Sequence, residues 1–131
     1  MRKSAVRITG VCALTAALAL SAAACGSQDK KAACDNLQKT ITEVSQKGMT
    51  QVSDPNGLAQ TYAGGAATMR RQGKDSGDDK VEKAANDAAS ALESLGRQVK
   101  TIATSGSTTP QMPDAGKLTA AGAELKSACE G

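Results

Sequence analysis

The chain has 131 residues, which is enough for one small domain, and 40% of them are hydrophobic. It contains no His, Trp or Phe, and Tyr62 is its only aromatic residue, which excludes Ser-His catalysis, His-ligated zinc and aromatic platforms for nucleic-acid bases. Of the 16 basic residues, three precede Cys25, whereas all 13 acidic residues follow it. The part of the chain from Cys25 onward is therefore neutral, and its charge gives no support for a nucleic-acid partner.

The N-terminal segment has the pattern of an export signal. Met1 to Gly10 carries three basic residues and no acid, and Val11 to Ala24 is apolar and rich in small residues. We therefore expect residues 1–24 to be a cleaved signal helix. Export by the general secretory route is expected because no Arg-Arg pair precedes the apolar segment. The apolar run from Ile8 to Ala24 is 17 residues long, at the low limit for a membrane span, so a retained transmembrane anchor is the alternative.

The residues from Leu20 to Ser27, Leu-Ser-Ala-Ala-Ala-Cys-Gly-Ser, resemble a bacterial lipobox. In that family a small residue precedes a cysteine that is diacylated and becomes the new N-terminus, although the family prefers Leu where this chain has Ala22. The Ala-rich signal is similar to those of actinobacterial lipoproteins. The resemblance implies cleavage between Ala24 and Cys25, a diacylglyceryl group on Cys25 and a lipid anchor on the extracytoplasmic face of the cell membrane. It covers residues 1–27 only.

The cysteine count agrees with this resemblance. Of the four cysteines, Cys12 leaves with the signal, and three is an odd number for an exported protein. Lipidation consumes the thiol of Cys25 and leaves Cys34 and Cys129 as a pair, for which we predict a structural disulfide. A redox-active pair is the weaker alternative, because no Cys-x-x-Cys motif and no activating His is present. Signal peptidase cleavage without lipidation would instead give a freely secreted protein with a free Cys25.

A polar segment at residues 25–31 is predicted to be the lipid-proximal tether of a helical domain at residues 32–131. The first helix of the domain is expected from Lys31 to Val52. Its apolar residues recur at spacings of three, four and three, which places them on one helix face. These residues are Cys34, Leu37, Ile41 and Val44.

The second helix is predicted from Asp54, as N-cap, and Pro55, as first helical residue, to about Gln72. The pair Gly64-Gly65 inside it indicates either close approach of a neighbouring helix, which we favour, or a hinge.

The strongest pattern in the chain predicts a third helix from Asp78 to Thr104, capped in capping-box fashion by Ser76. Its apolar residues follow a heptad, a pattern that requires partner helices from the same chain or from a second copy. These residues, here called the heptad seam, are Val81, Ala85, Ala88, Leu92, Leu95, Val99 and Ile102.

A loop is expected at residues 105–113, followed by a last helix from about Asp114. The face of this helix is predicted to consist of Leu118, Gly122, Leu125 and Cys129. Four amphipathic helices in succession predict an all-α fold, a small antiparallel four-helix bundle. In that topology the first helix begins and the last helix ends at the same pole, so a bridge between Cys34 and Cys129 is geometrically natural.

The sequence favours a non-enzymatic, membrane-anchored binding or scaffold module with a protein or cell-wall partner. A carrier of a small apolar ligand is the alternative, and a pocket lined by Leu, Met and Tyr62 would favour it. No catalytic residues, metal ligands or cofactor are predicted, because the best acidic cluster, Asp78, Asp79 and Glu82, suits the positive start of a helix.

Overall fold

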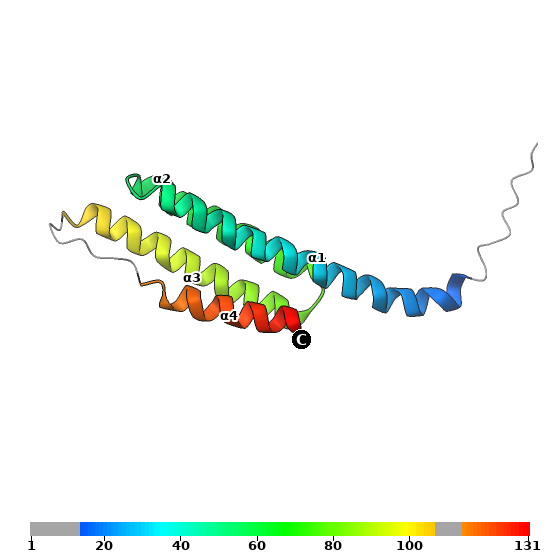
Figure 1. Cartoon of the computed structure of the whole chain (residues 1–131). Helices are drawn as coiled ribbons and strands as arrows, with labels where there is room; N and C mark the ends of the chain where they lie inside the picture. The colour runs from blue at the N-terminus through cyan, green and yellow to red at the C-terminus, as the bar shows by residue number, and fades with distance from the viewer. Residues whose placement is uncertain (1–13, 107–113) are drawn as a thin grey trace, which may run out of the picture.

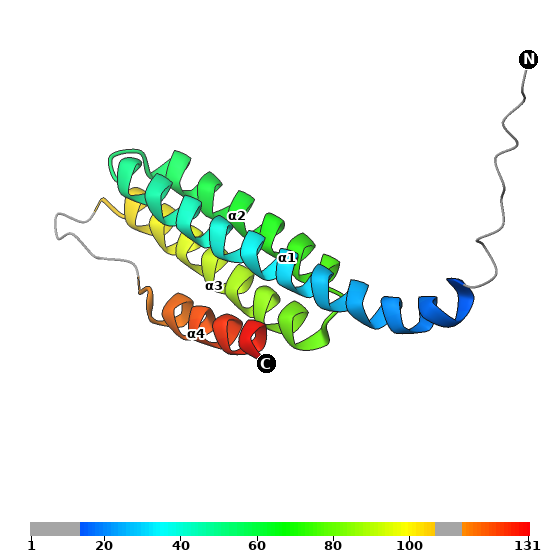
Figure 2. The ribbon, with the colours of Figure 1, turned by 45° about the vertical axis from the view of Figure 1, so that its right-hand side comes forward.

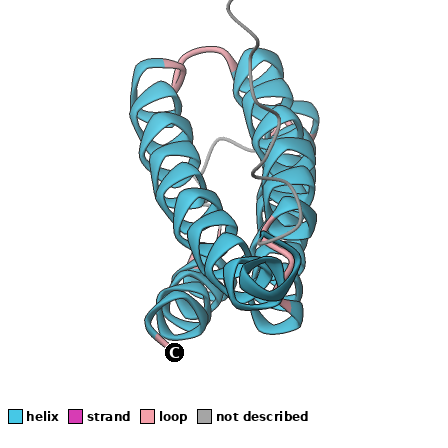
Figure 3. Ribbon diagram, turned by 90° about the vertical axis from the view of Figure 1, so that its right-hand side faces the viewer, coloured by secondary structure: helices cyan, strands magenta, loops and turns pink. Residues whose placement is uncertain are grey.

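A computed structural model of the chain describes the backbone of residues 14–106 and 114–131, and side chains within those ranges from residue 29 onward. The described chain forms α1 (Leu14–Thr50), α2 (Pro55–Asp75), α3 (Asp79–Thr104) and α4 (Gly116–Glu130), with consecutive helices running in opposite directions (Figure 1). Figure 3 views the bundle from the end where α1 leaves it, and every described segment is helix or loop. The predicted all-α fold is confirmed, whereas residues 107–113 of the predicted loop lie outside the described ranges.

Each helix packs mainly on the helix next to it in sequence, and the first and last helices do not form a comparable interface. The α2–α3 interface is the most extensive, α1 packs on α2, and α4 packs on α3. By contrast, the backbone of α1 approaches those of α3 and α4 closely at only a few positions. α4 lies along α3, on the side away from α2 (Figure 2). The bundle therefore has an open seam between its first and last helices.

The heptad seam of α3 is buried as predicted from Val81 to Val99, while Ile102 is half-buried. The buried face is wider than the seam because α3 contacts α2 on one side and α4 on the other. The additional buried residues of α3 are all small: Ala84, Ala89, Ala91 and Gly96. Small side chains on both flanks allow two helices to approach α3 closely.

The start of α2 follows the prediction, and the start of α3 does not. The Asp54 carboxylate accepts a hydrogen bond from the Gly57 amide at 3.0 Å, with Pro55 as the first helical residue. At α3 the N-cap is Asp78 rather than Ser76, because the Asp78 carboxylate accepts from the amide nitrogens of Lys80 and Val81 at 3.0 and 3.1 Å. An Asp at the N-cap satisfies these otherwise orphaned amides.

Ser76 closes α2 instead of opening α3. Its buried hydroxyl donates to the Gly73 carbonyl, and the same oxygen accepts from the Asp78 amide at 3.2 Å. As a result α2 continues to Asp75, beyond the predicted end at Gln72. The chain then reverses at Gly77, whose φ of +64° lies in the left-handed region that favours glycine.

Two predicted boundaries of the outer helices shift by two residues. α1 ends at Thr50 instead of Val52. α4 begins at Gly116, because the carboxylate of Asp114 accepts a hydrogen bond from the Gly116 amide at 2.9 Å and holds the preceding residues out of the helix. On the inward face of α4, Leu125 is fully buried as predicted, but Ala121 rather than Gly122 is buried beside it.

The predicted tether is helical, because α1 runs without interruption from Leu14 through residues 25–31 into the bundle. Near its end, the Lys30 ammonium lies 3.1 Å from the carboxylate of Asp78, which is the N-cap of α3. The segment that precedes the bundle is thus held to it at its last turn. Whether the segment acts as a lipid tether stays a prediction.

The two glycines at positions 64 and 65 have opposite environments, and α2 passes through both as one helix. A Cβ added to Gly65 would lie 2.5 Å from Val44 Cγ2 of α1 and 3.4 Å from Leu92 Cδ1 of α3. A Cβ added to Gly64 would meet nothing within 4 Å. The interpretation of close helix approach is confirmed at Gly65.

Gly64→Ala and Gly65→Ala are therefore expected to change stability in opposite directions. Alanine is favoured over glycine in a helix by about 1 kcal/mol, so the open Gly64 site should gain up to that amount. At Gly65 the same gain is opposed by an overpacking cost of about 1–3 kcal/mol, because the branched Val44 must move. Urea unfolding of the two variants, followed by circular dichroism, checks this. A shift of the two midpoints in the same direction would contradict the assigned packing.

Candidate functional site

The structure contains the predicted disulfide between Cys34 of α1 and Cys129 of α4. The two Cα atoms are 5.9 Å apart and the residues are separated by 95 positions in sequence. The bridge lies at the pole where α1 leaves the bundle and the C-terminus ends (Figure 1). The bridge is a covalent connection between α1 and α4, whose backbones otherwise approach closely at few positions although Leu37 and Leu125 share the core.

An apolar groove of about 260 Å³ lies beside this bridge, between α1 and α4. It is lined by Gln38, Ile41, Gly122, Leu125, Lys126 and Cys129. Of the Leu, Met and Tyr side chains that would favour a carrier, only Leu125 lines this groove, since Met69 is fully buried elsewhere and Tyr62 packs against the core. The groove is below the usual size of a ligand pocket, so it gives the carrier alternative little support.

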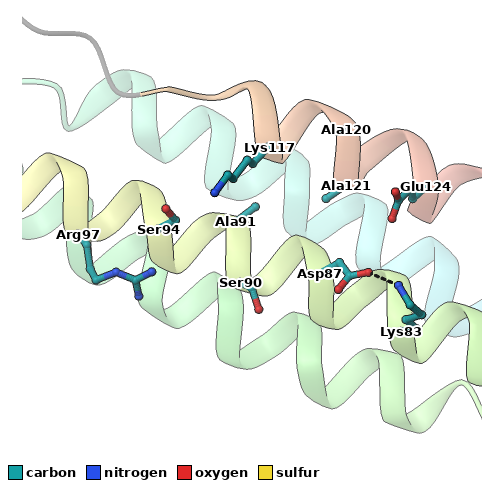
Figure 4. A pocket seen from close by; sticks show the side chains of 10 residues that line it. All are labelled: Lys83, Asp87, Ser90, Ala91, Ser94, Arg97, Lys117, Ala120, Ala121 and Glu124. Carbon is teal, nitrogen blue, oxygen red and sulfur yellow. Dashed lines mark hydrogen bonds and ion pairs between the residues drawn. The ribbon is translucent and has the colours of Figure 1, made fainter.

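A larger groove, of about 490 Å³, separates α3 from α4 (Figure 4). Its floor is made by Ala91 and Ala121, both buried, and its rims carry charged and hydroxyl side chains from the two helices. Sequence reasoning missed this groove. The sequence of α4 contains alanines beside charged residues, a pattern consistent with such a groove. The spacing of its apolar residues did not predict that Ala121 rather than Gly122 would face inward.

The charges of this groove are divided between its two ends. At one end the Lys83 ammonium lies 2.7 Å from the Asp87 carboxylate, and this hydrogen bond, with the charges of Asp87 and then Glu124, raises the pKa of Lys83. At the other end are Arg97 and Lys117, which have no carboxylate within ion-pair distance among the described residues. The segments 1–28 and 107–113 contain no acidic residue that would pair with them.

Arg70 of α2 forms an ion pair across the interface with α3. Its guanidinium donates two hydrogen bonds to the Glu93 carboxylate of α3, one of them at 3.0 Å, and these bonds lower the pKa of Glu93. Lys83 pairs with Asp87, and Glu93 pairs with Arg70 rather than with Arg97, which stands four residues away on the same helix. Bidentate geometry favours the Arg70 contact.

The predicted acidic cluster has a structural role. Asp78 is the N-cap of α3, and Asp79 and Glu82 lie in its first turn, where negative charge is favoured. The pKa of Asp78 is lowered chiefly by the hydrogen bond from the Val81 amide and then by Lys30. Among the side chains described in residues 29–106 and 114–131, no group of three or more Cys, Asp or Glu is placed to hold a metal ion.

The described helices were also compared with the requirements of a membrane span, and none is both long and apolar enough to cross a bilayer. Cys25 lies within α1, and its side chain is outside the described set, as is that of Ala24.

Comparison of the chain with protein-family models, with curated proteins and with solved structures gives no match.

Proposed function

We propose that the protein is a lipoprotein anchored to the extracytoplasmic face of the cell membrane through a diacylglyceryl group on Cys25, where it acts as a non-enzymatic binding or scaffold module. The observation that carries the proposal is the lipobox-like segment ending at Cys25, which continues as α1 directly into the bundle. Cys25 and Cys34 are nine residues apart, or about 14 Å along a helix. The stapled pole would therefore face the membrane.

Two physical arguments support this arrangement. Two acyl chains give stable anchoring where one chain would give only reversible binding. A disulfide is compatible with an oxidising extracytoplasmic compartment and rare in a reducing cytoplasm. The far pole of the bundle, at the α1–α2 turn, then points away from the membrane and presents Met49 and Val52, each 72% exposed. An exposed apolar pair at that position suits contact with a protein or cell-wall partner.

Intact mass spectrometry of the membrane fraction from the native host tests the anchor. The expected species begins at Cys25, carries a diacylglyceryl group, and shows two alkylatable thiols only after reduction. Cys25→Ser should abolish the lipid and release the protein from the membrane, or leave it unprocessed. Cys12→Ser is the matched control, because Cys12 would be removed with the signal. An unlipidated wild-type protein in the medium, with a free thiol at Cys25, would favour the freely secreted alternative.

A further inference from the structure

The stretch of α1 that leads into the bundle has few apolar contacts with the other helices. Residues 29–33 contribute one buried side chain, Ala33, and the first large buried side chain described in α1 is Leu37. A gap of about 190 Å³ separates this stretch from the end of α2, where Gln72 and Asp75 line it. α1 extends beyond the other three helices at this pole (Figure 2). Apolar packing therefore contributes little to holding residues 25–33 in place.

Lys30 supplies a contact where packing is sparse. Its ammonium lies 3.1 Å from the Asp78 carboxylate, and the two side chains are largely shielded, with 20% and 29% of their surfaces exposed. Lys30 and Cys34 are four residues apart, so they lie on the same face of α1. Successive turns of α1 are thus fastened to different helices, by an ion pair to the N-cap of α3 and by a covalent bond to Cys129 of α4.

The two fastenings differ in strength, and this difference sets how far the bundle can move from residue 25. With both closed, only the five steps from residue 25 to Lys30 can extend, over about 17 Å. With the ion pair open and the disulfide intact, nine steps can extend, over about 31 Å. A partly exposed ion pair opens readily and is screened by salt, whereas the disulfide opens only when it is reduced.

We propose that the Lys30–Asp78 ion pair is a latch that keeps residues 25–33 helical and holds the bundle in one orientation over the lipid anchor, with the Cys34–Cys129 disulfide as the limit of movement when the latch opens. In the latched state the end of α1, at Thr50, lies about 37 Å along the helix from residue 25. The role at the membrane rests on the proposed anchor at Cys25, whereas the latch depends only on the contact between α1 and α3.

Amide hydrogen exchange of the mature lipidated protein in phosphatidylcholine nanodiscs, followed by nuclear magnetic resonance, tests the latch. In an α-helix the amides of residues 29–32 donate to the carbonyls of residues 25–28, so their exchange reports whether this segment is helical. We expect protection of these amides in the wild type. Lys30→Gln and Asp78→Asn should each raise their exchange rates about two- to fivefold, the factor that a partly exposed ion pair supplies. Asn is also a good N-cap, so Asp78→Asn removes the charge and keeps the start of α3.

Lys31→Gln is the matched control, because Lys31 is the adjacent, exposed lysine, and it should leave the exchange rates unchanged. Unprotected amides at residues 29–32 in the wild type, or equal rates in all three variants, would overturn the latch. The same exchange pattern is expected in unlipidated protein, so a failure of the anchor is distinguishable from a failure of the latch. Neutron reflectometry of the lipidated protein on a supported bilayer should show a more diffuse protein layer for Lys30→Gln than for Lys31→Gln, and identical layers would overturn the role in orientation.

Discussion

Replacing Cys34 and Cys129 together with serine is expected to lower the free energy of unfolding by about 2–5 kcal/mol, the range seen when small exported domains lose a native disulfide. The bridge joins residues 95 positions apart, so its loss releases nearly the whole domain in the unfolded state. In the chain-entropy account, loops of this length give the upper part of that range.

The native structure adds a second reason for a large effect. α1 is held by α2 and α4 is held by α3, but α1 and α4 have only marginal contact with each other. Without the bridge, α1 and α4 are joined only by side-chain packing in the shared core and through the middle helices. We therefore expect α1 and α4 to separate locally as well as in global unfolding. Amide protection should be lost first in α4, the shortest of the described helices.

Thermal and urea unfolding of the mature protein, followed by circular dichroism, measures this effect. Reduced wild-type protein, kept under reducing conditions, should have the same unfolding midpoint as the double-serine variant, because both lack the same covalent link. Cys34→Ser alone should match the double variant in stability, although it leaves a free thiol at Cys129. A double variant as stable as the oxidised wild type would show that helix packing alone holds α1 and α4 together.

The elements with a strong local pattern were predictable from sequence. The heptad seam specified α3 and its buried face, and Asp54-Pro55 specified the start of α2, because each depends on interactions within a few residues. The cysteine pair was predictable because the lipobox resemblance assigned Cys25 to the lipid, and the helix order then placed Cys34 and Cys129 at the same pole of the bundle. The lipid anchor is a prediction that the structure leaves untested.

Features decided by competing interactions were not predictable. Ser76 and Asp78 are both good caps at nearly adjacent positions, and only the way α2 ends decides that Asp78 caps α3. Glu93 has a suitable cation four residues away, Arg97, but bonds to Arg70 because α2 brings a bidentate partner within reach. That choice leaves Arg97 on the rim of the α3–α4 groove, so the candidate site depends on tertiary packing.

Leu92→Ala is expected to be the most damaging single core substitution, with a loss of about 2–5 kcal/mol in the free energy of unfolding. Among the described side chains, nine of the 19 buried hydrophobic residues are alanines, so the core has few large side chains that can move to refill a cavity. Leu92 is 1% exposed on the heptad seam, and the site beside Gly65 brings α1, α2 and α3 together around it. The cavity would open at the point where these three helices meet.

Two further variants separate cavity formation from the general effect of mutation. Leu92→Met keeps most of the volume and should cost less than about 1.5 kcal/mol. Val52→Ala also truncates an apolar side chain, but Val52 is 72% exposed, so its stability should change by no more than about 0.5 kcal/mol. Urea unfolding midpoints in the order Val52→Ala, Leu92→Met, Leu92→Ala, from most to least stable, are expected. A midpoint for Leu92→Ala close to that of Val52→Ala would mean that the alanine-rich core collapses around the gap, and that close backbone approach contributes more to stability than the leucine side chain does.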